Sequence, residues 1–146
     1  MFKKILIGTD GSQGGDRALA VARQLADDAH GSLVIVHVIR RIGGKGGLYP
    51  ELADENNVQV AIEAQAEEAR QSGITVETVF KPTDLDGPGD VIADVADSVD
   101  ADVIVVGNRG HSTLTEMLVG GVALRLLHIA KRPVLVVPPA RTSAPA

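Results

Sequence analysis

Four glycines in the last third of the chain have a spacing that places backbone around an anion. Gly107 ends an apolar run, Gly110 follows three residues later, and Gly120 and Gly121 come directly before a run with helical periodicity. A helix N-terminus presents N–H groups and the positive end of the helix dipole to an anion. Glycine lets the backbone approach the anion closely because it has no Cβ. One such glycine alone is best explained as a turn residue, whereas four in this arrangement predict a phosphate-binding site.

The elements that must position these glycines alternate along the chain. Runs rich in Val, Ile and Leu have the length of strands, at residues 4–8, 33–39, 74–80, 102–107 and 133–137. Apolar residues spaced by three and four predict helices between them, over residues 18–29, 58–69, 91–99 and 122–129. This alternation indicates an α/β fold with a parallel sheet covered on both faces. Ligands of such sheets bind at the carboxyl ends of the strands, where the connections diverge to opposite faces.

The composition of each run predicts its place in the sheet. Residues 33–39 and 102–107 are nearly all apolar, as burial of both faces requires, whereas residues 74–80 alternate and predict an edge strand. The last run is short and lies between Pro133 and Pro138. An apolar strand at a sheet edge invites pairing with another chain. We therefore hypothesise a homodimer in which Val134–Val137 pairs across a twofold axis.

Charge and composition limit the classes of partner. The chain has 14 basic and 19 acidic residues, a formal net charge of −5, and aromatic side chains only at Phe2, Tyr49 and Phe80. Nucleic acid is therefore not an expected partner, because its binding proteins have a basic face or stacking aromatics. A small phosphorylated molecule remains compatible with this charge. The absence of cysteine excludes disulfides and a cysteine nucleophile.

The histidines do not predict a metal site. No two of the four have the spacing of metal ligands. His37 lies in a strand predicted to be buried, and we expect a core or pocket-wall residue held by one hydrogen bond. His111 lies among the glycines, where contact with a phosphate and simple exposure in a loop are both open.

The chain length of 146 residues predicts a single domain, over residues 1–139. The apolar run before Gly8 is too short for a signal peptide or a membrane span, so a cytoplasmic protein is expected, with no membrane partner. Residues 40–53 are rich in glycine and predict a flexible loop. Residues 140–146 are rich in Pro, Ala and Ser and predict a disordered tail.

The sequence resembles the universal stress proteins. Their nucleotide-binding members have a glycine, two residues, a second glycine, nine residues, and then Gly-Ser or Gly-Thr, and residues 107–121 reproduce that spacing. The segments "KKILIGTDGS", "VIVHVI" and "AKRPVLVVP" are also similar to that family. The resemblance implies a doubly wound, open, five-stranded parallel sheet of order 3-2-1-4-5 with helices on both faces. It also implies a dimer that binds an adenine nucleotide at the switch point of the sheet.

The resemblance further implies which residues touch the nucleotide. The base and sugar would contact residues at the ends of three strands, namely Gly8, Thr9, Asp10, Val38, Val106 and Gly107. The phosphates would contact backbone N–H groups around the helix that follows, namely those of Gly110, Gly120, Gly121 and Val122. Considered without the family, Asp10 is equally well explained as the cap of the first helix.

One residue departs from the family pattern. Gly121 stands where Ser or Thr normally provides a hydroxyl to the outer phosphates. Loss of a hydrogen bond to a charged group costs roughly 1.5–3 kcal/mol, which is about ten- to a hundredfold in affinity. Binding of AMP, ADP or cyclic AMP, with or without Mg²⁺, is therefore expected more than binding of ATP. Arg109 could supply a compensating cation, although a solvated surface arginine is the more common case.

No enzyme is expected from the motifs. The "SGG" and "HIGH" motifs of adenylyl-transferring enzymes are absent, and Ser12 has no Gly-x-Ser-x-Gly context for a hydrolase triad. Three hypotheses remain: a nucleotide-binding stress-response protein, which we prefer; a dimeric interaction scaffold without nucleotide; and a slow ATPase in which Asp10 or His111 positions water.

Overall fold

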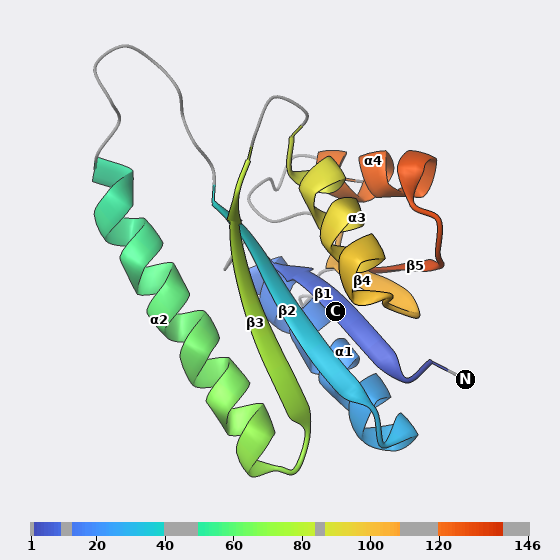
Figure 1. Ribbon diagram of the computed structural model, residues 1–146. Coiled ribbons are helices and arrows are strands. Elements are labelled where there is room, and N and C mark those ends of the chain that lie inside the picture. The colour runs from blue at the N-terminus through green and yellow to red at the C-terminus, as the bar shows by residue number, and fades with distance from the viewer. Residues whose placement is uncertain (1, 10–12, 40–49, 84–86, 109–119, 139–146) are drawn as a thin grey trace, which may run out of the picture.

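The structure, a computed structural model, describes residues 2–9, 13–39, 50–83, 87–108 and 120–138. In this part of the chain a single parallel sheet has the strand order β3-β2-β1-β4-β5, as expected (Figure 1). The strands are β1 (Lys4–Thr9), β2 (Ser32–Ile39), β3 (Thr75–Pro82), β4 (Val103–Gly107) and β5 (Val134–Val137). The helices are α1 (Gln13–Ala29), α2 (Pro50–Gln71), α3 (Pro88–Val99) and α4 (Gly121–Ile129). The predicted alternation of strand and helix is confirmed.

The strand positions follow from which faces are apolar. β1 is central, and Ile5, Leu6 and Ile7 are completely buried because helices cover both faces of the sheet there. β2 and β4 flank β1 in parallel, as their apolar composition predicted. β3 lies at one edge, where Thr75 and Glu77 are exposed and the residue between them is buried. β5 forms the other edge of the described sheet.

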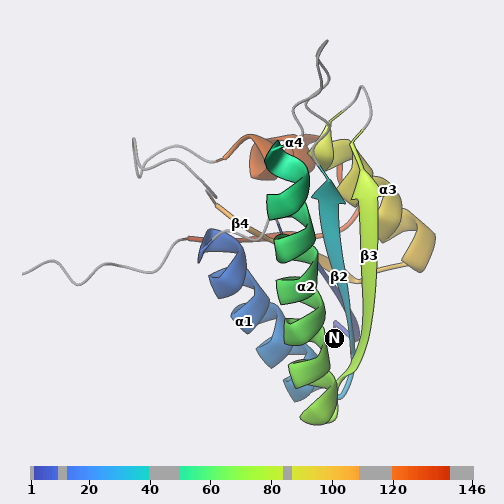
Figure 2. The same ribbon diagram turned by 90° about the vertical axis from the view of Figure 1, so that its left-hand side faces the viewer.

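Successive side chains of each strand point to opposite faces, and each face has its own core. Ile5 and Ile7 pack in the core beneath α1 and α2. Leu6 packs with the apolar side chains of α3 and α4 on the other face. Figure 2 shows α1 and α2 side by side on one side of the sheet. Arg23 of α1 joins the two helices through an ion pair of 3.2 Å with Glu68 of α2.

Two predictions about α2 need correction. The helix begins at Pro50, so the last residues of the predicted loop 40–53 are helical. Proline suits the first turn of a helix, where its missing N–H is not needed. The glycines before Pro50 led to the prediction of a loop that extended past the true start of the helix. Ala61, one of the apolar residues whose spacing predicted a helix over residues 58–69, is exposed, because α2 contacts the core through a narrow stripe that includes Ile62, Ala66 and Ala69. Residues 40–49 and 140–146 lie outside the described residues.

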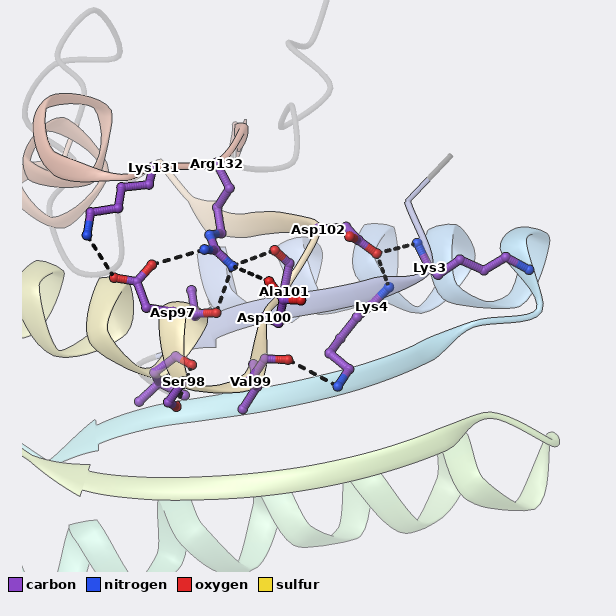
Figure 3. Close-up of polar contacts among 12 residues, drawn as sticks. Lys3, Lys4, Asp97, Ser98, Val99, Asp100, Ala101, Asp102, Lys131 and Arg132 are labelled. Atoms are coloured by element: carbon purple, nitrogen blue, oxygen red, sulfur yellow. Dashed lines mark hydrogen bonds and ion pairs between the residues drawn. The ribbon is translucent and has the colours of Figure 1, made fainter.

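Arg132, just before β5, closes the carboxyl end of α3 (Figure 3). Its Nη1 donates to the carbonyl oxygens of Ala96 at 2.8 Å and Ala101 at 2.7 Å, and its Nη2 lies 3.1 Å from Oδ1 of Asp97. The Ala96 carbonyl also accepts from the Ala101 N–H at 3.0 Å, and the cation opposes the negative end of the helix dipole. Arg132 therefore caps α3 and ties its end to β5.

Asp102, just before β4, fixes the start of β1 at the same end of the sheet (Figure 3). Its Oδ2 accepts hydrogen bonds from the backbone N–H groups of Lys4 at 2.8 Å and Lys3 at 2.9 Å. The bond from Lys4, followed by that from Lys3, favours the ionised carboxylate and lowers the pKa of Asp102 below its ordinary value. The Lys4 ammonium donates to the Val99 carbonyl at 3.1 Å. These contacts join the amino ends of β1 and β4 to the end of α3.

None of the helices in the described ranges is both long enough and apolar enough to cross a membrane.

Candidate functional site

The carboxyl ends of β1, β2 and β4 meet at the opposite edge of the sheet. Gly8 of β1 is in register with Val106 of β4, and Thr9 is in register with His37 of β2. The chain passes from β1 to α1 on one face, and from β4 to α4 on the other. The connections therefore diverge between β1 and β4, which is the kind of position where open α/β sheets bind ligands.

Asn108 and Gly120 bring the end of β4 and the start of α4 together. The Gly120 N–H donates to the Asn108 main-chain oxygen at 2.9 Å and to its side-chain Oδ1 at 3.1 Å. The Asn108 N–H in turn donates to the Val137 carbonyl of β5 at 2.8 Å. Asparagine suits this position because its side-chain Oδ1 and its main-chain oxygen can both accept the Gly120 N–H. The sequence showed the Gly107-Asn108 pair but gave no sign of this bridge.

The bridge changes the expected role of Gly120. Its N–H was predicted to meet a phosphate, but in the structure it is already donated to Asn108. The first helical hydrogen bond of α4 runs from the Leu124 N–H to the Gly120 carbonyl. The N–H groups of Gly121 and Val122 therefore have no acceptor within the helix, as at every helix N-terminus. These two amides remain the described candidates for contact with a phosphate.

Gly121 has room for a side chain. It is exposed, its backbone is not left-handed, and a Cβ added there would meet nothing within 4 Å. Glycine is therefore not required by the fold at this position. The described residues therefore give no steric reason for glycine in place of Ser or Thr at position 121.

Gly8 has the opposite character. A Cβ at Gly8 would lie 2.7 Å from Cδ1 of Ile92 on α3 and 3.4 Å from Cγ1 of Val106. Gly8 thus lets α3 pack closely on the end of β1. This close packing is a structural reason for the glycine that does not depend on a ligand.

Some of the other predicted site residues are described by the structure and others are not. Val38 and Val106 are buried in the core beneath α3 and α4, with 7% and 2% of their surface exposed. Gly107 ends β4 and is half-buried. Asp10, Arg109 and Gly110 lie outside the described residues, as does His111.

An ion pair that the sequence did not predict holds α3 against α4. Arg125 Nε lies 2.8 Å from Asp90 Oδ1, and Arg125 Nη2 lies 3.0 Å from Asp90 Oδ2. The hydrogen bond from Arg125 is the main cause that lowers the pKa of Asp90. The partners are 35 residues apart in the sequence, and neither belongs to a motif. Only the acidic residue in the first turn of a helix gave a local signal.

His37 has more partners than expected. Its Nδ1 lies 3.0 Å from the Thr9 carbonyl oxygen, and its Nε2 lies 2.8 Å from Oε2 and 3.0 Å from Oε1 of Glu55 on α2. The sequence predicted a buried histidine with one hydrogen bond, and burial is confirmed. Glu55 was not foreseen because α2 was expected to begin later and its first turns carry no apolar pattern.

Comparison with known proteins agrees with this arrangement of strands and helices. The model of the universal stress protein family matches residues 1–138. The chain belongs to the universal stress protein family. Universal stress protein YxiE of Bacillus subtilis is 33% identical over 150 aligned residues, which cover 94% of this chain and 99% of YxiE.

Solved universal stress proteins share the fold. UspA from Lactobacillus plantarum superposes with a TM-score of 0.79 at 19% identity, covering 93% of this chain and 97% of its own. A universal stress protein in complex with cAMP superposes with a TM-score of 0.71 at 29% identity, covering 95% of this chain and 99% of its own. In this universal stress protein, the described residues include no group of three or more His, Asp or Glu side chains placed to hold a metal ion.

Proposed function

We propose that this universal stress protein binds an adenine nucleotide at the carboxyl ends of β1 and β4 and acts as a regulatory binding protein in the stress response. The observation that carries the proposal is the bridge between Asn108 and Gly120, which fixes the start of α4 beside the end of β4. A helix N-terminus at a switch point is suited to a phosphate. The relative in complex with cAMP supports an adenine nucleotide as the ligand.

The phosphate contacts that we propose favour a single phosphate. The N–H groups of Gly121 and Val122 offer two donors at the start of α4, and the helix dipole adds attraction for an anion. The hydroxyl that would support outer phosphates is absent at Gly121. Family members with Ser or Thr at this position have the missing hydroxyl. Compared with them, we expect this protein to favour cyclic AMP or AMP over ATP more strongly. Mg²⁺ would accompany a nucleotide with more than one phosphate.

Isothermal titration tests the proposal with ATP, ADP, AMP and cyclic AMP, each with and without Mg²⁺, on protein freed of copurified nucleotide. We expect micromolar binding of at least one of them. Gly121→Asp should abolish it, because a carboxylate at the start of α4 repels a phosphate, while Gly121→Asn tests the same bulk without the charge. Flat titrations for all four nucleotides, or equal loss in both variants, would overturn the site.

A second proposal concerns the homodimer. β5 is an edge strand of the described sheet, and large apolar side chains are exposed on it and on α4, which contacts it. They are Leu124, Leu127 and Leu135, with 48%, 53% and 39% of their surface exposed. Exposed apolar side chains beside an unpaired strand edge favour association with a second copy through Val134–Val137. Such a dimer serves a nucleotide-binding protein and a nucleotide-independent scaffold equally well.

A further inference from the structure

His37 is the one polar side chain that the described residues bury within the core, with 4% of its surface exposed. Both of its ring nitrogens face hydrogen-bond acceptors. Nδ1 lies 3.0 Å from the carbonyl oxygen of Thr9, at the end of β1. Nε2 lies 2.8 Å from the nearer carboxylate oxygen of Glu55, in the second turn of α2. A carbonyl and an ionised carboxylate accept hydrogen bonds and donate none.

A neutral imidazole cannot satisfy both neighbours. It has one N–H, so one of its two contacts would bring a nitrogen lone pair against an oxygen lone pair. Such a contact in a buried place costs the free energy of an unmade hydrogen bond. An imidazolium has two N–H groups and donates to both acceptors, and its charge is balanced by Glu55. The arrangement of acceptors therefore selects the doubly protonated ring.

The other described neighbours of His37 and Glu55 do not remove the need for the second ring proton. Gln59, one turn along α2, donates from Nε2 to Oε2 of Glu55 at 2.9 Å, which occupies the carboxylate as an acceptor. The ring of Phe80 on β3 meets the imidazole edge-on, with centroids 6.1 Å apart. In the described ranges, Glu55 is the charged group in contact with His37, β1 contributes the Thr9 carbonyl, and β3 contributes an apolar ring.

We propose that the imidazolium of His37 is a proton-dependent latch, which fastens the first part of α2 to the end of β1 and loosens when the proton is lost. If Nε2 keeps the remaining proton, the contact with the Thr9 carbonyl becomes repulsive. If Nδ1 keeps it, the contact with Glu55 is lost and α2 is released. In both cases the edge that carries Thr9 is disturbed. Nucleotide affinity therefore falls as the pH rises through the loss of this proton, a consequence that rests on the proposed function.

Glu55→Gln is the variant that separates the latch from general packing. The glutamine amide can donate to an unprotonated Nε2, which leaves the Nδ1 hydrogen for the Thr9 carbonyl, so a neutral ring satisfies every contact. Glu67→Gln is the matched control, because it removes the same charge from an exposed side chain of α2 that pairs only with Arg70 among the described residues.

The first readout is the protonation of the ring in protein without nucleotide. Nitrogen-15 NMR over a pH series, with His37 assigned by its absence in His37→Gln, should show that the wild type and Glu67→Gln keep two protonated ring nitrogens to a higher pH than Glu55→Gln. Loss of the second ring proton at the same pH in all three proteins would overturn the latch.

The second readout is the protection of α2 against amide hydrogen exchange between about pH 6 and 9, where imidazoles and not carboxylates change charge. The wild type and Glu67→Gln should lose protection in the first turns of α2 by roughly three- to tenfold as the ring loses its proton. Glu55→Gln should show no such step. An identical pH dependence in all three proteins would also overturn the latch.

Titration with the tightest-binding adenine nucleotide over the same pH interval tests the link to the site. The wild-type affinity should fall by roughly three- to tenfold, and that of Glu55→Gln should not. Equal slopes would overturn the link between latch and site. If no nucleotide binds to any of the proteins, the proposed function is wrong and the link with it, while the NMR and exchange results still decide the latch itself.

Discussion

Arg125 of α4 and Asp90 of α3 form a two-point ion pair, with Nε to Oδ1 at 2.8 Å and Nη2 to Oδ2 at 3.0 Å. Gly89 makes the approach possible, because a Cβ on it would lie 2.9 Å from the Cβ of Arg125 and 2.8 Å from its Cγ. Paired N–H groups of a guanidinium fix both the distance and the orientation of a carboxylate. The pair therefore sets how α4, whose start carries the candidate phosphate donors, lies against α3.

Loss of this pair should misplace α4 more than it unfolds the protein. Asp90→Asn and Arg125→Ala should each weaken nucleotide binding by about two- to fivefold, as expected for loss of a partly exposed pair. The double variant should be no weaker than the more harmful single variant, because both remove one interaction. Titration of the four proteins measures this coupling. Additive losses would show that the two residues act separately.

Acid should unfold the protein partly through Asp102. Its pKa in the folded protein lies below the ordinary value of 3.8, because the N–H groups of Lys4 and Lys3 bind the ionised carboxylate. A group with a lowered folded-state pKa stabilises the fold above its unfolded-state pKa and loses that contribution as the pH falls through the folded-state value. We therefore expect Asp102→Asn to be less stable than the wild type at neutral pH.

The difference should shrink below about pH 4, where the wild-type carboxylate also becomes protonated. Thermal unfolding of both proteins between neutral pH and about pH 3 checks this. Asp94→Asn, which changes an exposed aspartate on α3, is the matched control and should not show the convergence. A constant difference at every pH would contradict the role assigned to the Asp102 carboxylate.

The inner strands and the two cores could be predicted because they depend on runs of apolar residues, whereas the full strand order was implied by the resemblance to the universal stress proteins. Residues 33–39 and 102–107 have apolar side chains on both faces, and such runs fit only inner strands of a covered sheet. The glycine spacing likewise placed Gly107 and Gly120 at the end of a strand and the start of a helix, as the structure has them. These features are local, so the sequence displays them directly.

The contacts that position the candidate site could not be predicted because they are made between distant residues by single polar side chains. Asp90 meets Arg125, and His37 meets Glu55, only after α3, α4 and α2 have packed on the sheet. Asn108 was visible beside Gly107, but its bond to Gly120 joins residues that lie 12 positions apart in the sequence. Periodicity predicts which face is buried and does not predict which polar groups pair at its border.

Gly8→Ala should destabilise the fold by about 1–3 kcal/mol, the usual cost of overpacking a core. The added methyl would lie 2.7 Å from Cδ1 of Ile92, a side chain that is itself buried. Ile92→Val removes that carbon, so the double variant should recover part of the loss. Urea unfolding measures both, and Gly121→Ala, where a Cβ meets nothing within 4 Å, serves as the control for alanine at a glycine. No recovery in the double variant would show that Gly8 is needed for another reason.

Gly121→Ser should tighten ATP binding by about ten- to a hundredfold and change AMP binding less. The structure permits the change, because position 121 has space for a side chain and a backbone that serine adopts without strain. The restored hydroxyl can donate to an outer phosphate that AMP lacks. Isothermal titration with both nucleotides measures the ratio, and Gly121→Ala adds the Cβ without the hydroxyl. Equal gains for ATP and AMP, or the same gain in Gly121→Ala, would mean that the hydroxyl is not what limits triphosphate binding.

Leu135→Lys should convert the proposed homodimer to monomers. Leu135 lies in the middle of the edge strand β5 and is 39% exposed, so a lysine there reaches water in a single chain but faces its own copy across a twofold axis. Like charges on an edge strand oppose strand pairing. Val60→Lys, at a 69% exposed position on α2, introduces the same residue away from β5 and should stay dimeric. Sedimentation equilibrium at micromolar concentration measures the mass. A wild-type mass of one chain would exclude the homodimer, and a dimeric Leu135→Lys would move the interface away from β5.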